Sequence, residues 1–184
     1  MSEATNPAFE HLLQLEQRCS QSANAVPSLQ DRADVWSGVG FRLADQFFLV
    51  PLNEIAEVLS MPAVTHVPGA LSWMKGVANV RGRLMTVMDL SGYFGLPVQT
   101  QFGPRRLLVF DQDDVYTGMA VDEVLGMQHV PEQDFLSRAS LPEQMNAITK
   151  FVRGAYQKDG QHWLVFSLRA LSQDPRFMQV AQVS

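Results

Sequence analysis

Side chains that do metal or nucleophilic chemistry are few in this sequence, and their spacing brings none of them together. No two of the four histidines have the i, i+3 or i, i+4 spacing of a helical metal pair (His11, His66, His129 and His162). The single cysteine, Cys19, excludes an intramolecular disulfide and every zinc site that needs two thiolates. No G-x-S-x-G nucleophile motif is present. We therefore expect no catalytic residue, no metal and no cofactor.

Two further patterns have simple structural explanations. The lone G-x-G at Gly38-Val39-Gly40 runs into an expected strand, whereas a phosphate cradle needs a helix N-terminus at that place. The acidic cluster of Asp111, Asp113 and Asp114 falls in a polar stretch between two expected strands, where aspartates usually face water. Neither pattern predicts a ligand site.

Four charged residues adjoin apolar strand-like runs and are harder to dismiss. Glu57 precedes Val58 in one such run, Arg81 follows another, and Asp89 and Asp122 each end one. One interpretation is a strand-end residue that points to water. The other is that Glu57 and Arg81 form an ion pair, because a partly buried charge without a partner is costly.

Composition limits the function classes. The chain has 184 residues, 18% of them charged, and a net charge of −5, which argues against a nucleic-acid binder. The first residues show no signal peptide, and no apolar run approaches the roughly 20 residues that cross a bilayer. We expect a cytoplasmic protein without membrane insertion, whose surface includes more uncharged area than usual for partners.

The first 34 residues differ from the remainder. Asn6-Pro7 favours a helix start, and an apolar face follows at helical spacing (Phe9, Leu12, Leu13, Leu15 and Cys19). A Ser-, Gln- and Asn-rich linker ends this segment. Two interpretations of the helix stay open: a strap over one end of the domain, or a handle for a pathway-specific partner.

From Trp36 the hydrophobic period becomes two, and about ten short strands form two runs of five, separated near residue 100. Val64–Val67 is among the expected strands, and Ile148–Tyr156 and His162–Phe166 form a last hairpin around Asp159-Gly160. Regular short strands without a βαβ rhythm predict a mainly β fold of two small barrels side by side. We expect lobes at 35–98 and 99–172, with strands possibly exchanged between them, and a tail at 173–184.

Three motifs, in the right order, resemble the CheW-like family. The stretch Lys75 to Leu84, KGVANVRGRL, continuing through Asp89-Leu90, is similar to the family signature GvxNlRG…vDL. Gly118 to Val124 resembles its VD-x-V strand, and Val152 to Ala155 its late hairpin. The N-terminal helix and Trp36 to Arg42 look more like the PilI branch, which serves the chemosensory system of type IV pili and twitching motility.

The resemblance implies two five-stranded SH3-like barrels and a non-catalytic adaptor between methyl-accepting chemoreceptors and a CheA-type histidine kinase, recruited to membrane-bound receptor arrays. One barrel end would dock the kinase regulatory domain, and a groove between the barrels the receptor's cytoplasmic tip. It implies a Glu57–Arg81 ion pair and these partner-binding residues: Ile55, Glu57, Val58, Val80, Arg81, Val87 and Val121. The sequence departs from the family at Thr86, usually proline, and at Phe166-Ser167-Leu168, where D-L is usual.

Two alternatives remain at this point. A flagellar-type adaptor has the same motifs and a different output. A small enzyme or ligand-binding barrel belongs to another class and needs convergent polar groups in a pocket, for which the sequence offers no spacing.

Overall fold

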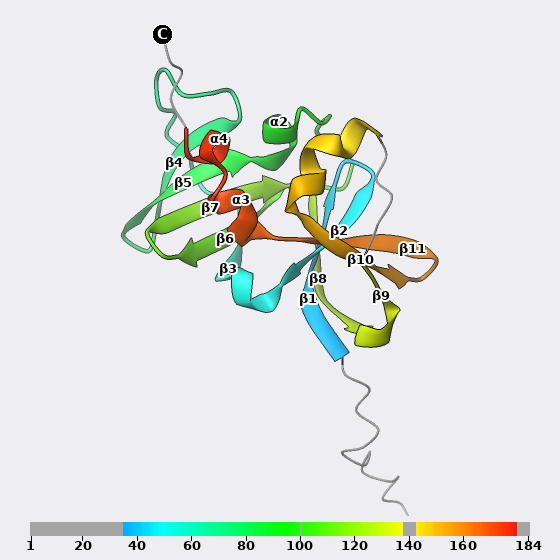
Figure 1. The fold of residues 1–184 in the computed structure, drawn as a ribbon. Helices are drawn as coiled ribbons and strands as arrows, with labels where there is room; N and C mark the ends of the chain where they lie inside the picture. The colour runs from blue at the N-terminus through cyan, green and yellow to red at the C-terminus, as the bar shows by residue number, and fades with distance from the viewer. Residues whose placement is uncertain (1–34, 100, 138–142, 180–184) are drawn as a thin grey trace, which may run out of the picture. The chain divides into compact units, whose positions relative to one another are not determined.

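The computed structural model describes residues 35–99, 101–137 and 143–179, so the expected N-terminal helix lies outside the described residues. Strands dominate, with short helical turns between them (Figure 1). The elements, in chain order, are β1 (Val35–Leu43), β2 (Gln46–Pro51), η1 (Leu52–Glu54), β3 (Glu57–Ser60), β4 (Met74–Val80), β5 (Arg83–Asp89), α2 (Leu90–Phe94), β6 (Arg106–Gln112), β7 (Val115–Val121), β8 (Glu123–Pro131), η2 (Glu132–Asp134), β9 (Phe135–Leu136), η3 (Glu143–Phe151), β10 (Val152–Lys158), β11 (Gln161–Phe166), α3 (Leu168–Ser172) and α4 (Pro175–Met178).

These strands form two sheets, which confirms the mainly β class. Sheet A has the order β8-β1-β2-β11-β10-β9, and sheet B has the order β3-β6-β7-β5-β4. Each sheet has one parallel pair, β2 with β11 in sheet A and β5 with β7 in sheet B, and its other pairs are antiparallel. Sheet A exceeds the expected five strands through β9, which has two residues.

The two sheets do not divide the chain near residue 98. Sheet B takes residues 57–121, whereas sheet A takes 35–51 and 123–166. The chain therefore crosses from sheet A to sheet B through residues 52–56 and returns at Asp122. The crossings, at residues 52–56 and at Asp122, therefore lie away from the expected lobe boundary at residues 98 and 99.

The strands β2, β6 and β7 contain consecutive buried residues, so side chains on both of their faces are buried. The largest apolar cluster joins the sheets, with Phe41 and Phe48 from sheet A and Leu108 and Met119 from sheet B. The opposite face of sheet B carries a second cluster around Met85, and that of sheet A a third around Trp163. A period of two thus places alternate residues in different clusters, rather than in core and solvent.

Local sequence explains several turns and helix ends. The β4–β5 hairpin turns at Arg81 and Gly82, whose φ angles are 52° and 83°, and the Asn79 side chain accepts a hydrogen bond from the Gly82 N–H at 2.9 Å. Asp89 caps α2 by accepting from the Gly92 N–H, and Ser167 caps α3 by accepting from the Ala170 N–H.

Two expected strands are wrong in part. Val64–Val67 forms only an isolated bridge between Thr65 and Val77, and residues 148–151 belong to η3. The apolar run there packs into the core as a 3-10 helix, with Ile148 and Phe151 buried. Short apolar runs fit either structure, because burial alone does not select a strand.

The segment after residue 172 packs onto the domain. Asp174 caps α4 and accepts a hydrogen bond from the Tyr93 hydroxyl at 3.0 Å. Phe177 is fully buried and stacks on Trp73 at 6.1 Å between ring centroids. Residues 173–179 therefore contribute to the core that joins the sheets.

Candidate functional site

The Glu57–Arg81 ion pair is present in sheet B, where it joins β3, one edge strand, to the turn after β4, the other edge strand. Arg81 Nη2 lies 2.7 Å from Glu57 Oε2; Glu57 begins β3 and Arg81 is in the β4–β5 turn. The Arg81 side chain is 75% exposed and that of Glu57 24% exposed. A pair this open to water adds little stability, so both charges are available to a partner.

A second ion pair adjoins the first. Arg83 bonds both carboxylate oxygens of Asp111 at 2.6 and 3.1 Å, and its guanidinium lies 4.0 Å from the centre of the Tyr116 ring. The hydrogen bond from Arg83 lowers the pKa of Asp111 and raises that of Arg83, so both stay charged. Together the pairs line a cleft of about 270 Å³ whose other walls are Ala56, Val80 and Tyr116. We call this the sheet B cleft.

The apolar candidates divide between surface and core. Val58, the residue after Glu57 in β3, is 40% exposed, and Ile55 and Val80 are partly buried. Val87 and Val121 are completely buried, Val87 in the sheet B cluster and Val121 in the cluster that joins the sheets. Neither Val87 nor Val121 presents surface to a partner, because both side chains lie inside apolar clusters.

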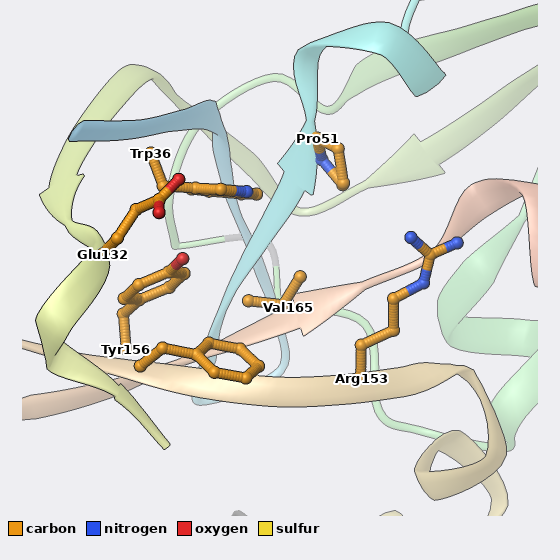
Figure 2. Close-up of a pocket in the computed structure, with 7 residues that line it drawn as sticks. Trp36, Pro51, Glu132, Arg153, Tyr156 and Val165 are labelled. Carbon is orange, nitrogen blue, oxygen red and sulfur yellow. The ribbon is translucent and has the colours of Figure 1, made fainter. Parts of the chain in front are cut away.

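A second cleft lies in sheet A, and no sequence motif pointed to it. It has a volume of about 330 Å³ and is lined by Trp36, Pro51, Glu132, Phe135, Arg153, Tyr156 and Val165. Figure 2 shows Trp36, Tyr156 and Glu132 at one end and Arg153 at the other. We call this the sheet A cleft.

Aromatic packing shapes the sheet A cleft. The Trp36 and Tyr156 rings are 5.2 Å apart, and Phe135 lies 5.2 Å from Tyr156. Burial, with a smaller effect of Glu132, raises the pKa of Tyr156 and keeps its hydroxyl protonated. Phe135, which lines the cleft, is 41% exposed, so the cleft offers apolar surface. The aromatic residues of β1 and β10 are the sequence feature that could have indicated this cleft. The period-two pattern, however, assigns them to the core.

A shallow groove of about 350 Å³ runs along β5 and β7, with α4 at its side. Leu84, Thr86, Met88, Thr117 and Met178 are among its lining residues. Leu84 and Met178 are 69% and 55% exposed. Thr86, where the family usually has proline, lies on β5, an interior strand between β4 and β7. Its carbonyl accepts a hydrogen bond from the Thr117 hydroxyl at 3.1 Å.

Asp89 and Asp122 do not belong to an exposed surface. Both are buried, at 2% and 0% exposure, and both lie near Arg105, at 2.7 Å from Asp89 and 3.6 Å from Asp122. Burial would raise the pKa of Asp89, but Arg105 and Lys75 outweigh it and hold that pKa below its usual value. The water-facing interpretation is therefore wrong for these two residues.

Sequence reasoning also missed Glu54, a buried carboxylate in η1. It accepts hydrogen bonds from Arg153 Nη2 at 2.9 Å, the Ser167 hydroxyl at 3.1 Å and the Arg169 N–H at 3.0 Å. Its partners are about a hundred residues away in sequence, so no local pattern indicates the contact. Glu54 ties the first crossing to β10 and α3.

No group of three His, Cys, Asp or Glu side chains within residues 35–99, 101–137 and 143–179 is placed to hold a metal ion. In the same part of the chain, none of the helices has the length and apolar character needed to span a membrane.

Comparisons with known proteins agree with the motifs. The family model of the CheW-like domain matches residues 37–176. Protein PilI of Pseudomonas aeruginosa strain PAO1 is 43% identical over 181 residues, which cover 98% of this chain and 99% of that protein. The chemotaxis protein CheW of Thermotoga maritima is 25% identical over 136 residues, 74% of this chain and 87% of that protein.

A solved structure shares the fold. The crystal structure of the scaffolding protein TtCheW from Thermoanaerobacter tengcongensis aligns with a TM-score of 0.64 at 22% identity. The alignment covers 76% of this chain and 94% of that one.

Proposed function

The chain belongs to the CheW-like family, and from this premise we propose that it is a non-catalytic adaptor that couples methyl-accepting chemoreceptors to a CheA-type histidine kinase. Its 43% sequence identity to PilI, over nearly the whole length of both proteins, favours the pathway that controls type IV pili and twitching motility. In this role the protein acts in the cytoplasm and is recruited to membrane-bound receptor arrays.

The observation that carries the proposal is the Glu57–Arg81 pair at the mouth of the sheet B cleft. The pair joins Glu57 of β3 to Arg81 in the β4–β5 turn, and Val58, the residue after Glu57, is 40% exposed. Charged groups over a small apolar area are typical of interfaces that form and dissociate, since the charges set orientation and the apolar part supplies affinity. The sheet A cleft supplies a separate surface, and an adaptor needs at least two.

Charge reversal at Arg81 tests the partner role. Arg81→Glu places two carboxylates together at the sheet B cleft, and we expect affinity for the receptor tip or the kinase regulatory domain to fall at least about tenfold. The free energy of unfolding should change by less than about 0.5 kcal/mol, because the pair is exposed. Calorimetric titration against each purified partner measures the affinity, and urea denaturation measures the free energy of unfolding.

Two further variants isolate the cause. Lys158→Glu, a charge reversal on sheet A, serves as the control and should leave binding at the sheet B cleft unchanged. The exchange Glu57→Arg with Arg81→Glu restores an ion pair but inverts the charges that face a partner. Recovery of binding by the exchange would assign the pair a positioning role. An Arg81→Glu protein that binds both partners normally would overturn the proposal.

The pathway branch needs its own measurement. Affinity capture from native lysate, followed by identification of the proteins retained, should recover a CheA-type kinase together with a receptor of the pilus system. Recovery of a flagellar receptor and kinase instead would assign the protein to the flagellar branch.

A further inference from the structure

The return of the chain from sheet B to sheet A takes a single residue. β7 ends at Val121 and β8 begins at Glu123, so Asp122 alone joins the two sheets at this crossing. Its side chain has no exposed surface. A carboxylate is expensive to bury, so its partners must be placed accurately.

Asp122 bonds to both sheets. On the sheet A side, one carboxylate oxygen accepts from the Ala44 N–H at 2.8 Å, in the turn between β1 and β2, and the Asp122 N–H donates to the Arg42 carbonyl at 3.2 Å. On the sheet B side, the other oxygen accepts from the Ser91 hydroxyl at 3.4 Å and lies 3.6 Å from Arg105 Nε.

Arg105 extends the network within sheet B. Its Nη2 donates to Asp89 at 2.7 Å and to the Ala120 carbonyl at 3.1 Å, and its Nε donates to the Val121 carbonyl at 3.4 Å. The Arg105 side chain is 16% exposed, and Lys75 reaches Asp89 from the surface at 3.1 Å. The guanidinium therefore binds the ends of β5 and β7 together, next to the crossing.

We propose that Asp122 and Arg105 form a joint that fixes the orientation of sheet A relative to sheet B. The apolar cluster between the sheets holds them together through the hydrophobic effect, which is itself non-directional. Hydrogen bonds are directional, and a buried carboxylate loses several of them if the sheets turn. The joint thus holds the sheet A and sheet B clefts at one spacing, which goes beyond the proposed function and requires no partner.

The test measures the spacing directly. With Cys19 replaced by Ser, spin labels are attached to cysteines substituted for Thr65, which is bridged to β4, and Gln161 of β11; both side chains are exposed. Pulsed electron resonance then gives the distribution of distances between them. Asp122→Asn keeps an oxygen to accept from Ala44 but removes the charge beside Arg105, and we expect the distribution to widen at least about twofold.

The control is Asp113→Asn, in the exposed β6–β7 turn, which should retain the narrow distribution. A folded Asp122→Asn protein with the narrow distribution overturns the joint. If that variant does not fold, Arg105→Lys decides, since lysine keeps the charge but not the multiple bonds of the guanidinium. Hydrogen exchange of the Ala44 amide in the unaltered chain gives a further check: exchange faster than the core amides would also overturn it.

Discussion

The chain passes between its two sheets twice, and the crossings are built differently. At the second, Asp122 is bonded to both sheets through buried groups, with Arg105 beside it. At the first, Glu54 is equally buried, but its partners (Arg153, Ser167 and Arg169) all lie in β10 or around α3. Glu54 therefore fixes the crossing to the sheet A side alone.

The side-chain bonds of the first crossing to sheet B are at the surface. Gln112, at the end of β6, donates from its side chain to the Asn53 carbonyl, and its oxygen accepts from Arg169 at 3.0 Å. Exposed hydrogen bonds exchange readily with water and contribute little net stability. A buried carboxylate at a crossing therefore does not by itself join two lobes; the positions of its hydrogen-bond partners decide.

Matched arginine substitutions at the two crossings should differ most in their effect on the free energy of unfolding. Arg105→Met leaves Asp89 and Asp122 buried without their shared cation, and we expect unfolding to become easier by about 3–5 kcal/mol. Arg153→Met should cost only about 1 kcal/mol, because the Arg153 side chain is 54% exposed and Glu54 keeps its bonds to Ser167 and Arg169. Urea denaturation measures both, and equal losses would mean that the crossings are equivalent.

Acid pH should destabilise the second crossing through Asp89, with a smaller effect than the loss of Arg105. Because the pKa of Asp89 is lowered in the folded protein, its stabilisation is present above the unfolded pKa of about 3.9 and is lost as pH falls through the folded pKa. Asp89→Asn should therefore reduce the slope of unfolding free energy against pH in acid by up to about 1.4 kcal/mol per pH unit, the effect of one proton.

Urea denaturation between about pH 5 and pH 2 measures this slope around the unfolded pKa of the carboxylate. Asp113→Asn, in the exposed turn, is the matched control and should retain the slope of the unaltered protein. If the slope for Asp89→Asn is unchanged, the Asp89 carboxylate does not contribute to the acid sensitivity of the second crossing.

Local patterns predicted much of the fold. The turn at Asp159-Gly160 carries glycine at a positive φ, which is a property of the turn itself, and it marks the last hairpin. The Glu57–Arg81 pair followed from two motif positions, one in β3 and one in the β4–β5 turn. These features depend on short stretches whose geometry the residue types nearly determine.

Long-range features could not be obtained in this way. Val87 and Val121 were expected at a partner surface, but strands buried on both faces give no alternation that separates core from surface. The bond from Ala44 to Asp122 and the bonds to Glu54 join residues about 80 to 110 positions apart, which appear in no local pattern. Phe177 was expected in a tail, because four residues do not indicate what they pack against.

The smallest expected change in unfolding free energy comes from removing the exposed hydrogen bonds of the first crossing. Gln112→Ala removes its bonds to Asn53 and Arg169, and we expect a loss of unfolding free energy below about 0.5 kcal/mol. Gln46→Ala is the matched control, since the Gln46 side chain also donates to an exposed carbonyl, that of His162, but within sheet A. Urea denaturation of both should give similar small losses. A loss for Gln112→Ala approaching that of Arg105→Met would show that the first crossing also joins the sheets, and the contrast between a surface link and a buried joint would fail.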